Sequence, residues 1–189
     1  MRAVAAPLTR RRFTVDEYYR MAEAGILRED DRVELLDGEI VEMTPIGPGH
    51  AGQVNCLTRI FTSRLGDRAI VSVQNPVILG THWEPEPDFV LLRPRLDDYR
   101  TAHPRPADVL LVVEVADTSL ARDRKIKLPA YAAAGVPEVW ILNLREERIE
   151  VYRDPAADGY RDVRRWGRGT RLAPRAFSDL ELSVDEVLG

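Results

Sequence analysis

Apolar and polar positions follow two different periods along this chain, and the change between them divides the sequence into short elements. Apolar residues three and four positions apart predict helices, whereas alternating or short continuous apolar runs predict strands. Thr14 is a good N-cap residue, and Asp16 and Glu17 follow it in the first turn, where they suit the helix dipole. We therefore expect helices over 15–24, over about 50–65, and from Thr118 or Ser119 to about Ala134.

The remaining apolar runs predict strands, six of them in pairs. We expect β-hairpins in 32–43 around the turn dipeptide Asp37-Gly38, in 138–144 with 148–154, and in 159–165 with 170–173. Single strands are expected at 69–79, interrupted at Pro76, at 88–94, and at 108–116. The last run is nearly all apolar, as in a central strand that is buried on both faces. This order predicts an α/β protein (α+β in layout) with a central mixed β-sheet, flanking helices and additional hairpins.

Composition sets the size and class of this fold. The chain has 189 residues, the usual length of one domain, and can bury roughly 70% of its unfolded surface without a disulfide or structural metal. We expect a single domain over 13–189 behind a flexible N-terminal arm, 1–12. The single cysteine, Cys56, excludes an internal disulfide and suits a reducing compartment. The chain has neither a long apolar run nor a secretory signal pattern, so we expect a cytoplasmic protein without a membrane span.

The net charge of −4 argues against a protein whose main task is to coat nucleic acid, because such proteins carry a basic balance. Any nucleic-acid surface must therefore be local. Of the 27 basic residues, only Lys125 and Lys127 are lysines, and both fall in one short segment.

Glu114 is the most informative residue, because it interrupts the apolar run LLVVEVA. An isolated carboxylate is expensive to bury, so it must be neutralised, paired with a cation or bound to a metal. Asp88 begins the preceding strand, and two neighbouring strands can bring both carboxylates to one ion. Mg²⁺, or Mn²⁺ in its place, takes oxygen ligands and commonly one or two carboxylates. The alternative from residue types alone is a buried salt bridge from Glu114 to Lys127 or an arginine, with Asp88 only at a strand end.

The helix after Glu114 carries Asp123, Lys127 and Tyr131 at spacings of four residues, which places them on one face. Pro129 is expected to kink this helix or to mark a restart. The short connection from the strand predicts that the helix packs near Glu114, where Lys127 would contact an attacking water or a phosphate. The alternative is an Asp123–Lys127 pair on the surface, worth a few tenths of a kcal/mol.

An ordered set of segments along most of the chain resembles a known family. The segments are ELLDGEIVEM (34–43), GPGH (47–50), QNPV (74–77), EPDF (86–89) and VVEVADTSLARDRKIKLPAYAAAGVPEVWILNL (112–144). This set is similar to the "putative restriction endonuclease" family of the PD-(D/E)XK nuclease superfamily. The resemblance implies a restriction-endonuclease-like core and metal-dependent cleavage of DNA.

The resemblance also implies roles for single residues. Asp88 matches the PD element, and Glu114 matches the acidic residue of the (D/E)XK element. Ala116 stands where the superfamily pattern has lysine, and Lys127 on the following helix matches the place to which that lysine has moved. Glu34 matches an additional acidic ligand, direct or through water.

His50 and Gln74 match family positions without a defined role, and Asp123 joins them as an accessory residue. From residue types alone, Glu34 is equally a solvated hairpin residue and His50 a helix cap. Gln74 lies in an apolar strand, where its amide needs partners and is available to orient Asp88, Glu114 or a phosphate.

The segment YRDVRRWGRGTR (160–171) supplies a local basic surface, with Arg164, Arg165 and Arg168 as candidate DNA contacts and Arg10–Arg12 as a further basic arm. Such a run is also typical of a solvated hairpin face. We expect a Mg²⁺-dependent DNA endonuclease that acts as a homodimer. The alternatives are a catalytically idle relative that binds DNA or a protein, and a structural domain with a buried Glu114–Lys127 pair.

Overall fold

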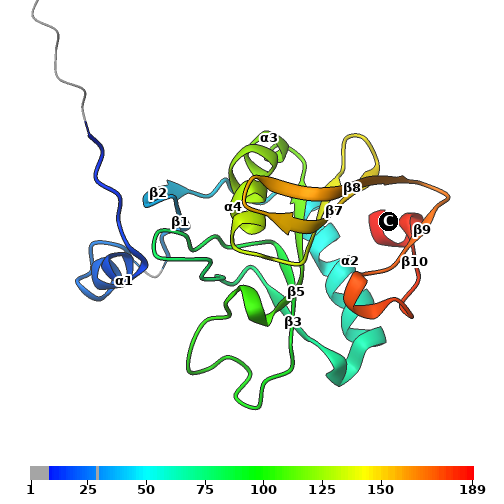
Figure 1. The fold of residues 1–189 in the computed structure, drawn as a ribbon, viewed down its shortest axis with the longest axis horizontal. Helices are drawn as coiled ribbons and strands as arrows, with labels where there is room; N and C mark the ends of the chain where they lie inside the picture. The colour runs from blue at the N-terminus through cyan, green and yellow to red at the C-terminus, as the bar shows by residue number, and fades with distance from the viewer. Residues whose placement is uncertain (1–8, 29) are drawn as a thin grey trace, which may run out of the picture.

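A mixed six-stranded β-sheet forms the centre of the protein (Figure 1). The structure, a computed structural model, describes residues 9–28 and 30–189. The strand order is β3-β4-β5-β6-β7-β8, and only β5 and β6 run parallel. The strands are Ile70–Val73 (β3), Phe89–Leu92 (β4), Val109–Ala116 (β5), Glu138–Asn143 (β6), Arg148–Ala156 (β7) and Gly159–Gly167 (β8). The predicted fold class, a mixed sheet with flanking helices and extra hairpins, is confirmed.

Smaller elements surround this sheet. Two short antiparallel pairs are Val33–Leu36 (β1) with Glu39–Glu42 (β2), and Arg171–Leu172 (β9) with Leu182–Ser183 (β10). The α-helices are Val15–Glu23 (α1), Pro48–Leu65 (α2), Leu120–Arg122 (α3), Leu128–Ala133 (α4) and Val184–Leu188 (α5). Single 3-10 turns occur at Gly66–Arg68, Pro106–Asp108 and Arg175–Phe177. No helix among the described residues is both long and apolar enough to cross a membrane.

The predicted local signals for α1 and for the first hairpin are confirmed. Thr14 caps α1 in a capping box with Glu17, in which each side chain bonds the other residue's backbone N–H. The β1–β2 turn has φ of 52° at Asp37 and 75° at Gly38, the left-handed backbone that a two-residue hairpin turn requires. The hairpin presents Glu34 toward the sheet, so its turn helps to place a candidate site residue.

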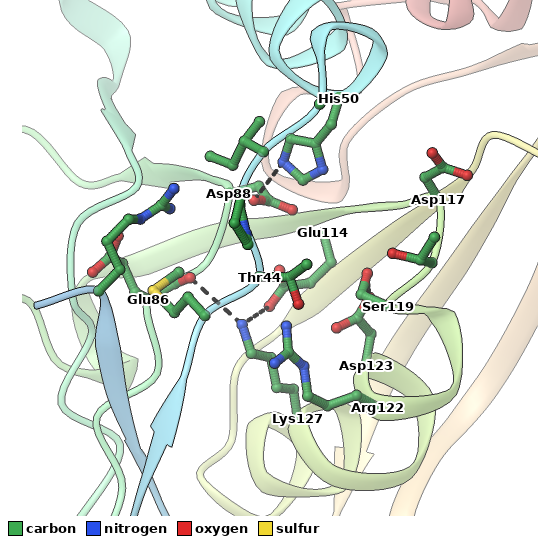
Figure 2. A pocket seen from close by; sticks show the side chains of 16 residues that line it. Thr44, His50, Glu86, Asp88, Glu114, Asp117, Ser119, Arg122, Asp123 and Lys127 are labelled. Atoms are coloured by element: carbon green, nitrogen blue, oxygen red, sulfur yellow. Dashed lines mark hydrogen bonds and ion pairs between the residues drawn. The ribbon is translucent and has the colours of Figure 1, made fainter.

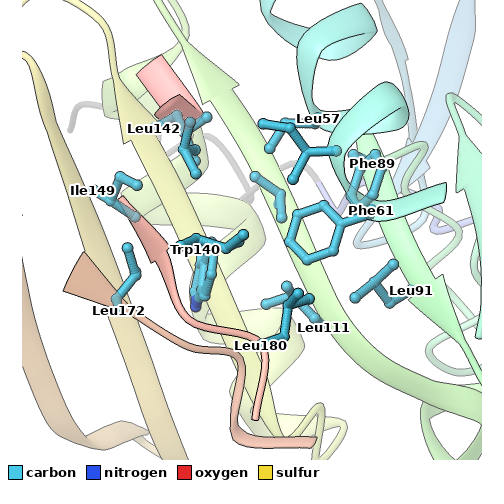
Figure 3. Packing of buried hydrophobic residues seen from close by; sticks show 14 of the residues in the cluster. Leu57, Phe61, Phe89, Leu91, Leu111, Trp140, Leu142, Ile149, Leu172 and Leu180 are labelled. Carbon is cyan, nitrogen blue, oxygen red and sulfur yellow. The ribbon is translucent and has the colours of Figure 1, made fainter. Parts of the chain in front are cut away.

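The two faces of β5 pack against different partners, as the predicted alternation requires. On one face, Val112 and Ala116 join an apolar cluster with Tyr131 of α4, and Glu114 faces the same helical segment (Figure 2). On the other face, Leu111, Val113 and Val115 pack in the larger cluster. Figure 3 shows this cluster between the sheet, α2 and the C-terminal segment, with Trp140 and Phe61 near its middle. A strand with apolar partners on both faces is a rigid support for the one carboxylate that it buries.

The helix after β5 changes its hydrogen-bond pattern just before Pro129, where the sequence predicts a kink or a restart. A π-helical turn, Asp123–Lys127, joins α3 to α4, and the Leu128 N–H donates to the Asp123 carbonyl. The backbone stays helical through Lys127 and Leu128, and Pro129 follows as the second residue of α4. Ser119 precedes α3, but its hydroxyl donates to Asp123 and does not cap the backbone.

The pairing predicted for the third hairpin was wrong. β8 pairs along its length with β7, and residues 171–172 pair with 182–183. The expected strand 69–79 also ends early, at Val73, because Gln74 takes a left-handed backbone with φ of 49°. Residues 171–172 and 182–183 are segments that local patterns do not link, whereas β7 and β8 form a hairpin around residues 157–158. Of the predicted arm 1–12, residues 1–8 lie outside the described residues, and Arg10–Arg12 each pair with a carboxylate.

Gly38→Ala should destabilise the protein by about 2–5 kcal/mol. An L residue at positive φ costs about 1–2 kcal/mol, and overpacking adds about 1–3 kcal/mol. A Cβ at position 38 would lie 2.5 Å from the Arg12 Cβ and 2.9 Å from the Phe13 nitrogen. Urea unfolding of the variant measures the loss.

Gly25→Ala is the matched control, because Gly25 also has positive φ (71°) but a Cβ there would meet no atom within 4 Å. Its free energy of unfolding should fall by only about 1–2 kcal/mol, the cost of placing an L residue at positive φ. Equal losses in the two variants would contradict this prediction, because they would show that the close contact of Gly38 with Arg12 and Phe13 adds no steric cost.

Candidate metal centre and active site

Asp88 and Glu114 lie together at the point where β4 meets β5. Phe89 of β4 pairs with Val113 of β5 in antiparallel register, and continuing this register by one position places Asp88 opposite Glu114. The Val115 N–H donates to Asp88 Oδ2 at 2.8 Å, and His50 Nε2 lies 2.8 Å from Asp88 Oδ1. Both oxygens of Asp88 are thus oriented, one by strand backbone and one by the first turn of α2.

Lys127 is buried between two carboxylates from different parts of the chain (Figure 2). Its Nζ lies 3.0 Å from Glu34 Oε2 and 3.4 Å from Glu114 Oε1. It also donates to the Glu86 carbonyl at 3.5 Å. Lys127 and Glu114 are each 3% exposed and Glu34 is 1% exposed, so water screens these charges little. The interpretation of Glu34 as a solvated hairpin residue was therefore wrong.

The helical segment brings Asp123, Lys127 and Tyr131 to one side, as their spacing predicts. The Tyr131 hydroxyl donates to Glu114 Oε1 at 2.7 Å, and the Ser119 hydroxyl donates to Asp123 Oδ2 at 2.6 Å. Asp123 and Lys127 are both buried, which excludes the alternative of a surface ion pair. The segment therefore supplies a cation, a carboxylate and a phenol to the same region as the strand carboxylates.

The electrostatics of the cluster reflect burial and excess negative charge. Burial raises the pKa of Glu114. The charge of Lys127 opposes this rise, whereas the charges of Asp123 and Asp88 add to it. Burial alone would lower the pKa of Lys127, but Glu114, Glu34 and the nearby aspartates outweigh it, so this pKa is raised. The hydrogen bond that His50 makes to the Asp88 carboxylate raises the pKa of His50. Lys127 is therefore an ammonium ion at neutral pH, and each carboxylate favours added positive charge.

All of these groups except Glu34 line one cavity of about 90 Å³. Its walls come from the loop after β2, the start of α2, the ends of β4 and β5, and the segment Asp117–Lys127. The side chains of Asp88, Glu114 and Lys127 line this cavity, and so do those of His50, Asp117 and Arg122 (Figure 2). The cavity is large enough for an ion with a few waters and opens toward solvent at the protein surface.

Two sets of candidate residues lie apart from this cavity. Gln74 follows β3, and its backbone N–H, rather than its side chain, reaches Asp88, donating to the main-chain carbonyl at 3.2 Å. Arg164, Arg165 and Arg168 lie on or just after β8, and β6 and β7 separate that strand from β5. Arg164 pairs with Asp162, and Arg168 pairs with Glu147 and Asp185.

Sequence reasoning missed the contribution of Arg122 and Asp117 to the cavity. Asp117 directly follows β5, and Arg122 is the last residue of α3. Nothing in the sequence around them separates them from ordinary solvated surface residues. The link between His50 and Asp88 was also not predicted. Tyr131 was placed on the correct face, but only the fold identifies Glu114 as its acceptor.

The donor set fits a hard divalent cation that keeps most of its waters. The described residues hold no ready-made group of three or more His, Cys, Asp or Glu side chains in metal-binding geometry. Mg²⁺, however, commonly takes only one or two protein carboxylates, with waters and phosphate oxygens as its other ligands. Asp88 and Glu114 supply those two, and Glu34 Oε1 is buried without a hydrogen-bond partner among the described residues.

Comparisons with known proteins agree on one family and one fold. A sequence model of the family described as "Putative restriction endonuclease" (Uma2) matches residues 15–185. The fold is similar to a crystal structure from Anabaena variabilis, described as a putative nuclease belonging to DUF820, with a TM-score of 0.75. The two chains are 17% identical over 93% of this chain and 97% of the other. No curated protein matches the chain in sequence.

Lys127→Met should lower the free energy of unfolding by about 3–5 kcal/mol at pH 8, because it leaves Glu34 and Glu114 buried without their cation. The loss should shrink at pH 5. The pKa of Glu114 is raised in the folded protein, so the folded protein holds this proton more tightly than the unfolded chain does. The resulting stabilisation is fully present below the unfolded-state pKa and is lost as the pH rises through the folded-state pKa. Urea unfolding at both pH values measures the difference.

Lys125→Met is the matched control, because Lys125 is exposed on the same helical segment and makes no ion pair with a described residue. It should change stability by less than about 0.5 kcal/mol at either pH. A Lys127→Met protein as stable as this control would contradict the assignment of Lys127 as the charge that holds the cluster together.

Proposed function

Since this chain belongs to the family described as "Putative restriction endonuclease", we propose that it is a metal-dependent endonuclease that hydrolyses phosphodiester bonds of DNA. The observation that carries the proposal is the cavity lined by Asp88, Glu114 and Lys127, with Glu34 buried behind the lysine. Metal-dependent phosphodiester hydrolysis uses carboxylates that hold the cation, and a positive group beside them helps to balance the phosphate charge. Family membership supports a nuclease, and this geometry supports the dependence on metal.

Asp88 and Glu114 are the proposed ligands of Mg²⁺ or Mn²⁺, and Glu34 is the proposed additional ligand, direct or through water. When bound, such an ion lowers the pKa of a water ligand and offsets the charge of the phosphate. The remaining tasks fall to the protein. His50 and the Val115 N–H orient the two oxygens of Asp88, and Tyr131 orients Glu114.

Lys127 takes the place of the strand lysine that this chain lacks. Ala116, at the position of that lysine, is buried in the apolar cluster on the Glu114 face of β5. Lys127 delivers its ammonium to Glu114 from the helix, at 3.4 Å. We propose that it fixes the position of Glu114 and lowers the charge repulsion against an approaching phosphate.

A catalytically idle DNA- or protein-binding module is the second candidate. The Lys127 ion pairs favour it, because they balance buried carboxylate charge without any metal. Turnover separates the proposed nuclease from the idle module, and a response to metal separates it from a purely structural domain.

We expect Mg²⁺ or Mn²⁺ to raise the melting temperature by mass action and to support nicking of plasmid DNA. Asp88→Asn and Glu114→Gln should each lose both effects, because each removes a charged ligand. Differential scanning fluorimetry and agarose gels measure the two responses. Glu42→Gln, an equal change of charge at an exposed position of β2, should retain both.

The pattern of outcomes separates the candidates. A metal response without nicking in the wild-type protein would favour the idle module. A melting temperature indifferent to metal in the wild-type protein would favour the structural domain and contradict the proposed metal site.

We also propose that β8 contributes to a path for the DNA backbone. Replacing Arg164, Arg165 and Arg168 with Gln should weaken DNA binding and reduce its salt dependence, because each phosphate contact releases roughly one counterion. Arg165, which makes no ion pair with a described residue, should account for most of the effect. Fluorescence anisotropy across a salt series measures affinity and slope.

A triple variant of Arg20, Arg28 and Arg59, which are exposed elsewhere, matches the change in net charge. If both triple variants lose the same affinity and slope, the effect is one of net charge and the backbone path lies elsewhere.

A homodimer stays a prediction. Cutting both strands of a duplex favours two sites, and β8 ends the sheet with an edge that no described strand pairs.

A further inference from the structure

The ammonium group of Lys127 already lies among three protein acceptors. These are Glu34 Oε2, Glu114 Oε1 and the Glu86 carbonyl, at 3.0, 3.4 and 3.5 Å from Nζ, and they match the three N–H donors of an ammonium in number. A phosphate that bound Lys127 directly would compete with them. A second protein cation would therefore assist the proposed metal ion in balancing the charge of a substrate phosphate in this cavity.

Arg122 is a cation with unused donors at that place. It lines the same cavity, and Figure 2 shows its side chain reaching from the helix toward the side where Lys127 and Glu114 lie. Its Nε is buried without a hydrogen-bond partner, and the guanidinium makes no ion pair with any described residue. By contrast, Arg124 on the same segment is paired, with its Nε 2.9 Å from Glu150 Oε2.

A buried N–H without an acceptor costs free energy unless a ligand or water satisfies it. Arg122 is thus arranged for an acceptor that the protein itself does not provide. Burial raises the pKa of Asp123, and the charge of Arg122 is one of the smaller effects that oppose this rise, so Arg122 lies near a carboxylate without forming an ion pair with it. An anionic ligand fits this position better than water, because a guanidinium bonds charged oxygens in a fork geometry.

The π-helical turn explains why Arg122 and Lys127 reach the same cavity. They are five residues apart, and the turn Asp123–Lys127 lies between them. A π turn bonds residues five apart, so it brings them closer to one line along the helix than an α turn does. Both residues line the cavity, with Lys127 in contact with Glu34 and Glu114.

We propose that Arg122 binds a non-bridging oxygen of the DNA phosphate that enters this cavity, while Lys127 only positions Glu34 and Glu114. This inference rests on the proposed function and gives the two cations of the cavity different roles, positioning for Lys127 and phosphate binding for Arg122. Asp88, Glu114, Asp117 and Asp123 line the cavity, so a phosphate would be repelled without a cation that is free to pair with it. The role is one of binding and assigns no proton transfer to Arg122.

The test measures binding of a fluorescein-labelled DNA duplex by anisotropy, with Ca²⁺ as the divalent ion, across a salt series. Arg122→Gln should weaken binding about tenfold or more and reduce the slope of log affinity against log salt by about 0.9, the value for one phosphate contact. Its metal-induced rise in melting temperature should equal that of the wild type. Lys125→Gln, with the same charge change on the same segment, should leave the slope unchanged.

Arg122→Lys keeps the charge but loses the fork, so it should restore the salt slope and only part of the affinity. This variant also preserves a test if Arg122→Gln does not fold. Wild-type affinity and slope in Arg122→Gln, with a normal metal response, would overturn this inference and leave the proposed function intact. Loss of the metal response together with affinity would make Arg122 a structural residue and overturn it as well. A wild-type protein that binds neither metal nor DNA would overturn both proposals.

Discussion

The buried ammonium of Lys127 is the interaction on which the arrangement of the site depends. It joins Glu34 of the β1–β2 hairpin, Glu114 of the central strand β5 and the carbonyl of Glu86, which lie far apart in the sequence. Removing a charge of either sign would leave the other uncompensated in a region with little water. The hairpin, the sheet and the divided helix are therefore held in one relative position by a small set of charges.

The same cluster places more acidic groups than basic groups around the cavity. Lys127 is one cation between Glu34 and Glu114, and Asp88 and Asp123 are two further acidic groups whose charges raise the pKa of Glu114. The remaining charge faces a cavity rather than apolar side chains. A hard divalent ion can occupy such a place with two protein ligands and waters. The ion pairs and the proposed metal site are thus parts of one charge distribution rather than alternatives.

Rigid supports around the cluster limit how far its members can move. β5 packs against apolar clusters on both faces, so Glu114 has a fixed backbone. Asp88 is oriented by the Val115 N–H and His50, and a phenol orients Glu114. The π-helical turn is the exception to regular structure here, and it places consecutive cationic residues of the helix in different surroundings. Well-supported side chains of this kind are what a catalytic or binding site needs.

The sequence by itself determined the features that depend on neighbours along the chain. Periodicity identified the main strands and helices, Asp37-Gly38 identified the first turn, and a carboxylate in an apolar run singled out Glu114. Tertiary structure decided what depends on pairing across long separations. It alone buried Glu34, joined His50 to Asp88, paired residues 171–172 with 182–183, and left Arg122 Nε without a partner among the described residues. Local pattern reports which face of an element is apolar, but the partner of a polar group is chosen only when distant segments pack together.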